Sequence, residues 1–357
     1  MVAQLLQGAD AITEAAIAAG CRFFAGYPML PFTDLLERMS RRLPQVGGVC
    51  MNAASELEAV NMTLGAAAAG ARAGTGSTGQ GVALMQEAVA EAAQAEIPFV
   101  VFTMARGQQD YFQCTRGGGW GDYRTITLAP RDVVEAAEHA QLAFHLADLY
   151  RSPTIFYGDY LIADTNMSVE VVARDYGELP AKDWAVDGSR GGTGKSRLIW
   201  SWDMGKVNNR GRQPDGQWRK VAAKFEEIAA AEQRHETFMA DDAEYLVVSW
   251  GTSAAFVDYV VEELRAEGVR IGSFRPITLW PFPEKALEEA AAKAKKVLVY
   301  EVNAGQMLED VRLSISDRSK IQFIGGVSVD YSGMRQGDIL EAAPIRERIR
   351  QAIAEGD

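Results

Sequence analysis

The chain has 357 residues, of which 48% are hydrophobic and 24% charged, and its formal net charge is −12. This composition is typical of a folded globular protein, and the length favours two domains over one. The acidic balance argues against nucleic acid or an anionic membrane surface as a partner.

No apolar run reaches the roughly 18 to 20 residues that a membrane span needs. Asp10 and Glu14 interrupt the apolar stretch near the N-terminus, so it does not follow a signal-peptide pattern. We therefore expect a cytoplasmic protein without a membrane partner. The cysteines, Cys21, Cys50 and Cys114, lie far apart and form no CxxC motif, which argues against a disulfide framework or an iron–sulfur cluster held by this chain alone.

The first part of the chain alternates between helix and strand patterns. A helix pattern over 8–20 is followed by a short strand at 21–28 and a helix over 32–43. The alternation continues with helices over 56–71, 81–95 and 131–151 and with strands over 72–78, 98–105 and 152–162. This order predicts parallel βαβ units and an α/β fold.

The amino-acid composition changes after residue 165. From about 166 to 240 the chain is rich in polar residues and glycine, with one good helix pattern over 218–235. A second α/β pattern follows, with strands over 243–253, 269–277, 295–303 and 320–328 and a helix over 254–268. We expect an α/β domain at 1–165, a connecting arm at 166–240 and a second α/β domain at 241–357.

Two glycine-rich stretches are candidates for ligand contact. GTGSTG at 74–79 has the spacing of a dinucleotide fingerprint, but an earlier strand precedes it and no acidic residue ends a strand about 20 residues on. Gly79 and Gly81 would still let the backbone approach a ligand closely. RGGGWGDYR at 116–124 is either a mobile surface turn or a ligand-contacting loop, and both readings stay open.

The histidines indicate no metal cluster and no nucleophile–histidine pair, so we expect no metal site and assign any catalytic power to a bound cofactor. Glu56 is the candidate acid, at the start of a helix pattern with Ser55 as its cap. One interpretation is a solvated first-turn residue favoured by the helix dipole. The other is a buried carboxylate facing a ring nitrogen of a cofactor, as in thiamine diphosphate enzymes.

The ordered series of motifs resembles a known family. It comprises GYPMLP at 26–31, ASELEAVNMTLGAAAAGARAGTGSTGQGVALMQE at 54–87, PFVVFTMAR at 98–106, GGGWGDYRTITLAP at 117–130, WPFP at 280–283 and YEVNAGQM at 300–307. This series is similar to the α subunit of 2-oxoacid:ferredoxin oxidoreductases, most of all to the 2-oxoisovalerate and 2-oxoglutarate members.

The resemblance implies a thiamine-diphosphate-binding-type parallel sheet domain, followed by a transketolase C-terminal-like α/β domain. It implies oxidative decarboxylation of a 2-oxoacid to an acyl-CoA, with electrons passed through 4Fe–4S clusters to ferredoxin. In that family thiamine diphosphate is shared with a β subunit that carries the diphosphate and Mg²⁺ site. The clusters lie in partner subunits, CoA is a co-substrate, and γ and ferredoxin-like δ subunits complete the assembly.

Carried over by position, Glu56 is the glutamate that activates the pyrimidine ring and Arg106 is the arginine that contacts the substrate carboxylate. A guanidinium suits a carboxylate because it offers planar paired donors and stays charged. The alternative for Arg106 is a surface cation at a strand end. The resemblance also implies a set of cofactor-binding residues: Tyr27, Pro28, Gly79, Gly81 and Glu56.

The sequence departs from the family at the expected substrate pocket. The usual Tyr-Pro-Ile-Thr-Pro motif has a threonine where this chain has Leu30, which cannot donate a hydrogen bond, and GQQDYFQC at 107–114 replaces a longer segment. We expect Leu30, Tyr111, Gln113 and Trp120 in the pocket. The changes leave open a bulkier, more apolar or aromatic acyl group, a thiamine-dependent decarboxylase or carboligase without an electron chain, or a non-catalytic regulatory paralogue.

Overall fold

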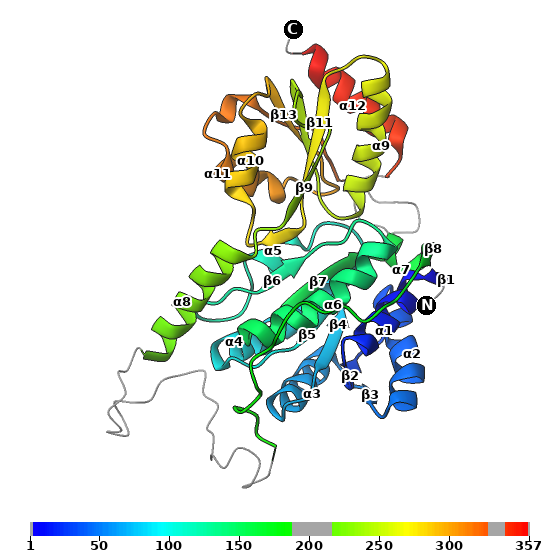
Figure 1. Cartoon of the computed structure of the whole chain (residues 1–357), viewed down its shortest axis with the longest axis vertical. Coiled ribbons are helices and arrows are strands. Elements are labelled where there is room, and N and C mark those ends of the chain that lie inside the picture. The colour runs from blue at the N-terminus through cyan, green and yellow to red at the C-terminus, as the bar shows by residue number, and fades with distance from the viewer. Residues whose placement is uncertain (1–2, 188–215, 328–339, 356–357) are drawn as a thin grey trace.

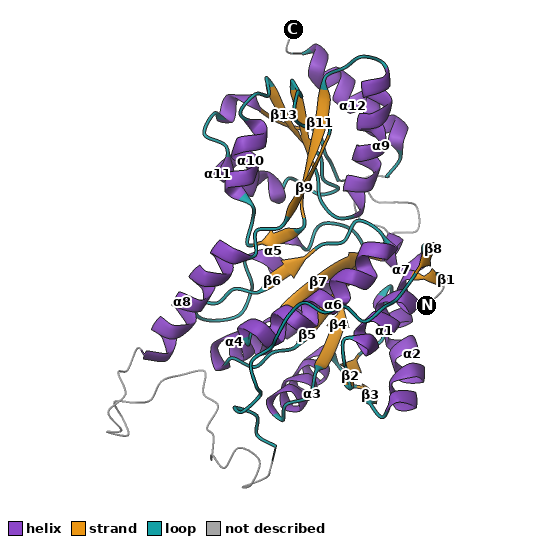
Figure 2. Cartoon of the chain, viewed as in Figure 1, coloured by secondary structure: helices purple, strands orange, loops and turns teal. Residues whose placement is uncertain are grey.

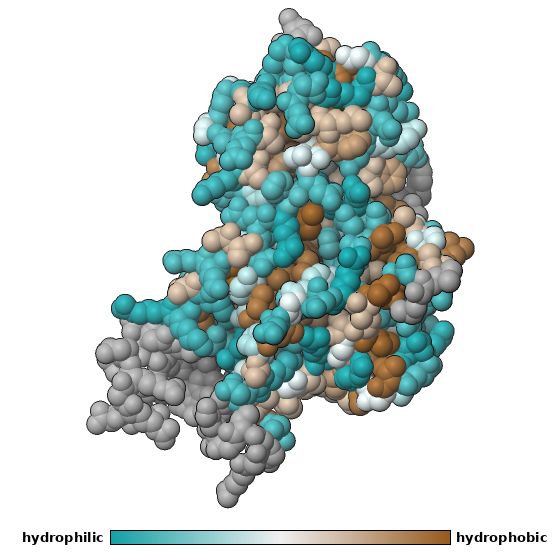
Figure 3. Space-filling model, viewed as in Figure 1, coloured by the Kyte–Doolittle hydropathy of each residue, from teal (hydrophilic) through white to brown (hydrophobic). Residues whose placement is uncertain are grey.

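The computed structural model describes residues 3–187, 216–327 and 340–355. The chain builds two α/β units, one around a seven-stranded sheet and one around a five-stranded sheet (Figure 1). Hydrophobic residues show on the surface mainly over the half that holds the larger sheet, whereas hydrophilic residues cover most of the other half (Figure 3).

The seven-stranded sheet has the order β12-β6-β7-β5-β4-β2-β3. Its strands are β2 (Phe23–Gly26), β3 (Val49–Asn52), β4 (Ala73–Ser77), β5 (Val100–Ala105), β6 (Ile126–Leu128), β7 (Thr154–Asp159) and β12 (Thr278–Trp280). All neighbours pair in parallel except β12, which runs antiparallel to β6. Every residue of the inner strands β4, β5 and β7 is buried, as expected for parallel strands covered on both faces.

Helices cover this sheet on both sides (Figure 2). They are α1 (Gly8–Ala18), α2 (Phe32–Arg42), α3 (Glu56–Ala68), α4 (Gly79–Ala95), α5 (Tyr111–Thr115), α6 (Val133–Tyr150) and α7 (Tyr160–Asp164), with a 3₁₀ turn at Leu43–Val46. Helix α1 packs against α6, and α3 packs against α4. Because parallel strands feed these crossover helices, the N-termini of α3 and α4 lie at the carboxyl edge of the sheet, where open α/β sheets bind ligands.

The second sheet has the order β14-β13-β10-β11-β9. Its strands are β9 (His235–Phe238), β10 (Tyr245–Val248), β11 (Ile271–Pro276), β13 (Lys296–Val299) and β14 (Ile321–Phe323), and β9 alone pairs antiparallel. Its helices are α9 (Thr252–Ala266), α10 (Glu284–Ala291), α11 (Met307–Ser314) and α12 (Ala342–Ala354), with a 3₁₀ turn at Arg318–Lys320.

Strands β1 (Gln4–Gln7) and β8 (Asn166–Val169) and helix α8 (Gly216–Ala231) complete the described elements. Strand β1 pairs antiparallel with β8, and helix α8 leads into the second sheet. The predicted domain limits at 165 and 240 stay a prediction. Strand β12 of the last segment lies in the first sheet, and strand β9 of the predicted arm lies in the second.

Candidate active site

Glu56 begins helix α3, but the neighbouring residues cap the helix. Ser55 Oγ accepts a hydrogen bond from Glu58 N over 3.2 Å, and Glu58 Oε2 accepts one from Ala54 N over 2.9 Å. These two bonds hold the start of α3 without the side chain of Glu56. Glu56 is only 4% exposed, and Ser77 Oγ donates to its Oε1 over 3.1 Å. The buried interpretation of Glu56 therefore matches its position, and the solvated one does not.

Glycines at the start of α4 make room for two carboxylates. A Cβ atom on Gly81 would lie 2.4 Å from Glu56 Oε1 and 2.1 Å from Ser77 Oγ, and one on Gly79 would lie 2.3 Å from Asp110 Oδ1. Thr78 caps this 17-residue helix by accepting a hydrogen bond from Gly79 N. The N-terminal end of a long helix such as α4 is electrically positive, so it attracts negatively charged groups that lie near it.

The loop after β2 meets the end of β5. Arg106, the first residue after β5, donates from Nε to the main-chain oxygen of Leu30 over 3.3 Å. Leu30 is 51% exposed and Tyr27 is 36% exposed, and Pro28 is exposed as well. The peptide bond between Leu30 and Pro31 is cis. The structure thus brings GYPMLP and Arg106 together.

Asp110 lies between Arg106 and the glycines of α4. Burial raises the pKa of its carboxyl group, while the hydrogen bond from Gln113 and the charge of Arg106 oppose this rise. Gln113 Nε2 donates to Asp110 Oδ1 over 2.6 Å and to Gly79 O over 3.1 Å. Gln113 therefore lies at the same edge of the sheet as the predicted cofactor glycines.

Tyr111 and Trp120 are held by other elements. Tyr111 is fully buried and donates from its hydroxyl group to Asp310 Oδ2 in α11 over 2.6 Å. Burial, and next the negative charge of Asp310, raise the pKa of Tyr111 well above its usual value. Trp120 Nε1 donates to Glu91 Oε1 in α4 over 2.8 Å. In the part of the chain that is described, neither side chain hydrogen-bonds to Glu56 or Arg106.

Sequence reasoning missed Ser77 and Asp110. Ser77 ends the glycine-rich strand β4, and Asp110 stands in the shortened loop after Arg106. Polar residues at the carboxyl ends of parallel strands were the signal that could have found both.

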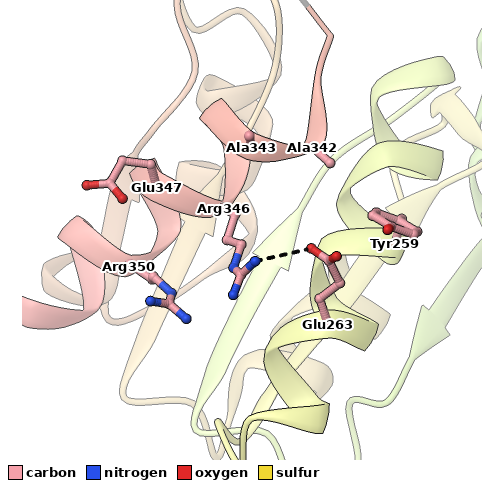
Figure 4. A pocket seen from close by; sticks show the side chains of 7 residues that line it. All are labelled: Tyr259, Glu263, Ala342, Ala343, Arg346, Glu347 and Arg350. Carbon is pink, nitrogen blue, oxygen red and sulfur yellow. Dashed lines mark ion pairs between the residues drawn. The ribbon is translucent and has the colours of Figure 1, made fainter.

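One pocket lies elsewhere, between α9 and α12 of the second unit (Figure 4). Its volume is about 390 Å³, and it is lined by Tyr259, Glu263, Ala342, Ala343, Arg346, Glu347 and Arg350. Arg346 and Arg350 both pair with Glu267, and Arg346 also pairs with Glu263, so two carboxylates balance the two guanidinium charges within the chain. Over residues 3–187, 216–327 and 340–355, no group of three or more His, Cys, Asp or Glu side chains could hold a metal ion.

Two family descriptions match separate parts of the chain. "Pyruvate flavodoxin/ferredoxin oxidoreductase, thiamine diP-bdg" covers residues 14–190, and "Pyruvate:ferredoxin oxidoreductase core domain II" covers residues 243–334. The ketoisovalerate oxidoreductase subunit VorB of Methanothermobacter marburgensis is 33% identical over 100% of both chains. The chain belongs to the family of 2-oxoacid:ferredoxin oxidoreductase α subunits. The predicted family and enzyme class are confirmed.

The chain is also similar to a second relative and to a solved structure. The 2-oxoglutarate synthase subunit KorA of Methanothermobacter thermautotrophicus is 32% identical and covers 89% of this chain and 93% of its own. The fold matches that of 2-oxoglutarate:ferredoxin oxidoreductase from Magnetococcus marinus, with a TM-score of 0.83 and 24% identity over 98% of this chain and 65% of that chain.

A split gene transketolase also shares the architecture. It has a TM-score of 0.58 and 12% identity, and the match covers 100% of this chain and 99% of that chain. The predicted fold class, a thiamine-diphosphate-binding domain followed by a transketolase C-terminal-like domain, is confirmed. In the described part of the α subunit, no helix is long and apolar enough to cross a membrane.

Proposed function

We propose that this α subunit forms the side of a thiamine diphosphate site that faces the pyrimidine ring, with Glu56 as the carboxylate that bonds to the ring nitrogen. The observation that carries the proposal is the burial of Glu56 at 4% exposure. Ser77 supplies the one hydrogen bond that the carboxylate of Glu56 receives from the described residues. A buried carboxylate needs more partners than this, because an unpaired buried charge is costly. A ring nitrogen that shares a proton with Glu56 would supply one.

The surroundings of Glu56 fit such a group. Any side chain at Gly81 would fill the space beside Glu56 Oε1, so the bare backbone keeps that carboxylate accessible. Gly79, Gly81, Tyr27 and Pro28 would hold the pyrimidine half. Thiamine diphosphate, when bound, supplies the electron sink that allows a 2-oxoacid to lose carbon dioxide. The part of Glu56 is to hold and exchange a proton at its carboxyl oxygens.

Arg106 is proposed to bind the carboxylate of the 2-oxoacid. Its Nε is engaged by Leu30 O, and its terminal nitrogens make no hydrogen bond to a described residue. They leave a planar pair of donors for a carboxylate. The adjacent Leu30 side chain is exposed and apolar, which supports a 2-oxoacid with an apolar acyl chain. Ketoisovalerate, named for the VorB relative, is an acid of this kind.

Partner subunits are proposed to complete the site. The following large apolar side chains of the loop after β2, of β3, of α3 and of α4 are 36% to 57% exposed: Tyr27, Leu30, Met51, Leu57 and Leu84. A β subunit that covers them would carry the diphosphate and Mg²⁺ site, and partners with 4Fe–4S clusters would pass electrons to ferredoxin. CoA would accept the acyl group, by analogy with the Magnetococcus marinus enzyme, which has coenzyme A and succinyl-CoA bound.

The test uses the complex co-purified with its partner subunits. Glu56→Gln keeps the shape of the side chain but removes the ionisable carboxyl group, and it should lower 2-oxoacid-dependent ferredoxin reduction by about two orders of magnitude or more. Glu58→Gln is the matched control, because Glu58 is exposed and only caps the helix. Full activity of Glu56→Gln would refute the assignment.

A further inference from the structure

Gln108 joins the loop after β5 to the second α/β unit. The side chain is 1% exposed, and its Nε2 donates to Trp250 O over 2.8 Å and to Ser253 Oγ over 3.2 Å. Its Oε1 accepts from Val302 N over 2.9 Å. Its main-chain oxygen accepts from Asn303 Nδ2 over 2.9 Å. Both ends of the amide and the backbone of Gln108 are therefore fixed by residues that lie more than a hundred positions away in sequence.

The backbone beside Arg106 is held from a second direction. Tyr157 donates from its hydroxyl group to Gly107 O over 2.9 Å. The Tyr157 ring packs edge-on against Trp250, with ring centroids 4.9 Å apart and an interplanar angle of 80°. The two residues that follow Arg106 therefore both have hydrogen-bonded carbonyl groups. Tyr157 donates to Gly107 O, and Asn303 of the second unit donates to Gln108 O.

We propose that Gln108 is a positioning residue for 2-oxoacid binding, because it fixes the main chain next to Arg106 and so sets where the guanidinium presents its donors. The inference rests on the proposed role of Arg106. Gln108 is buried and neutral, so it acts through Arg106 and not by touching the substrate. A long side chain binds a small anion well only when its own attachment point is immobile, and small misplacements are costly in rate and affinity.

A purely structural role predicts a different result. If Gln108 only holds the two units together, its loss should lower thermal stability and affect every substrate alike. If Gln108 positions Arg106, its loss should act on the 2-oxoacid and leave the affinities for CoA and thiamine diphosphate unchanged. Measuring the KM of each substrate and the Kd of the cofactor therefore distinguishes a structural role of Gln108 from a positioning role.

The experiment compares variants in the complex co-purified with its partner subunits. Gln108→Met keeps the volume of the side chain and removes its hydrogen bonds, and should raise the KM for the 2-oxoacid about tenfold or more. Gln108→Glu keeps an acceptor for Val302 N and regains a donor to Trp250 O when protonated, so its KM defect should shrink as the pH is lowered. Asp258→Asn is the matched control, since Asp258 ties α9 to Arg131 away from this loop.

Arg106→Lys is measured in parallel to separate two failures. If Arg106→Lys raises the KM for the 2-oxoacid while both Gln108 variants leave it unchanged, the positioning role is refuted and the proposed function stands. If Arg106→Lys also leaves this KM unchanged, the positioning role of Gln108 and the proposed role of Arg106 are both refuted, while the assignment of Glu56 is decided by its own variant. Should Gln108→Met fail to assemble, the pH dependence of KM in Gln108→Glu decides: a defect that does not shrink at lower pH refutes the inference.

Discussion

Arg106 Nε donates a hydrogen bond to the main-chain oxygen of Leu30 over 3.3 Å. The contact joins the ends of β2 and β5, which are separated in the sheet by β4. Because it uses the backbone of Leu30, it does not depend on the leucine side chain. A substitution of the Leu30 side chain therefore leaves the acceptor of the Arg106 bond, the Leu30 main-chain oxygen, in place.

Leu30→Thr should change substrate preference while preserving the fold. The variant keeps the main-chain bond to Arg106 but replaces an exposed apolar group by a hydroxyl that can donate. We expect the ratio of kcat/KM for a branched apolar 2-oxoacid to that for a small one to fall about tenfold, since a few methyl groups in a pocket are worth about 1–3 kcal/mol. Steady-state kinetics with both acids measure the ratio. An unchanged ratio would place Leu30 outside the pocket.

Arg106→Ala should weaken binding of the 2-oxoacid. A hydrogen bond to a charged group contributes about 1.5–3 kcal/mol, so the KM should rise about 10- to 100-fold. Arg41→Ala is the control, because the Arg41 side chain is 70% exposed and pairs only with Glu37 of its own helix. Equal KM values for the two variants would contradict the proposed role of Arg106.

Gly81→Ala should disrupt the space around Glu56. The new methyl group would lie 2.4 Å from Glu56 Oε1 and 2.1 Å from Ser77 Oγ, so the two side chains must move. We expect a loss of about 1–3 kcal/mol of unfolding free energy together with weaker binding of thiamine diphosphate. Gly65→Ala in α3 is the control, because nothing lies within 4 Å of its Cβ position and alanine should stabilise that helix by about 0.5–1 kcal/mol. Cofactor titration and denaturant unfolding report the two effects.

His139 should make folding stability fall in acid. Burial, and next the charge of Arg275, lower the pKa of His139 from 6.5 to about 3. The unfolded chain then binds a proton that the folded chain does not between these pH values, so stability decreases as the pH falls from 6.5 towards 3. The slope from one such group is at most about 1.4 kcal/mol per pH unit. Unfolding free energies of His139→Gln should show a shallower pH dependence there, and an identical dependence would contradict a neutral buried histidine.

Much of the fold could be predicted from periodicity. Amphipathic helices such as α2 and largely apolar strands such as β5 carry strong local patterns. The short strands β3, β6 and β12 were not predicted, although β2 and β14, which are of similar length, were. The pairing of β12 with β6 also joins residues about 150 positions apart. Such pairing is decided by tertiary packing, which local sequence does not encode.

The candidate site was predicted in part. The motif series led to Glu56, Gly81 and Arg106, and the structure places these residues at one edge of one sheet. The role of the loop after Arg106 could not be read from the sequence, because its partners lie in the second unit. Tyr111, expected in the pocket, instead bonds to Asp310, and no local pattern pointed to Gln108. The site assignments of Glu56, Gly81, Arg106 and Tyr111 stay predictions.

The central claim is that Glu56 acts on the ring nitrogen of the cofactor's pyrimidine. The most direct measurement is 2-oxoacid-dependent turnover of the assembled complex in a two-by-two comparison. It combines wild type or Glu56→Gln with thiamine diphosphate or an analogue whose pyrimidine nitrogen is replaced by carbon. If the two groups act as one unit, the combined change costs no more than either change alone. Additive losses, or full turnover by Glu56→Gln with thiamine diphosphate, would contradict the account.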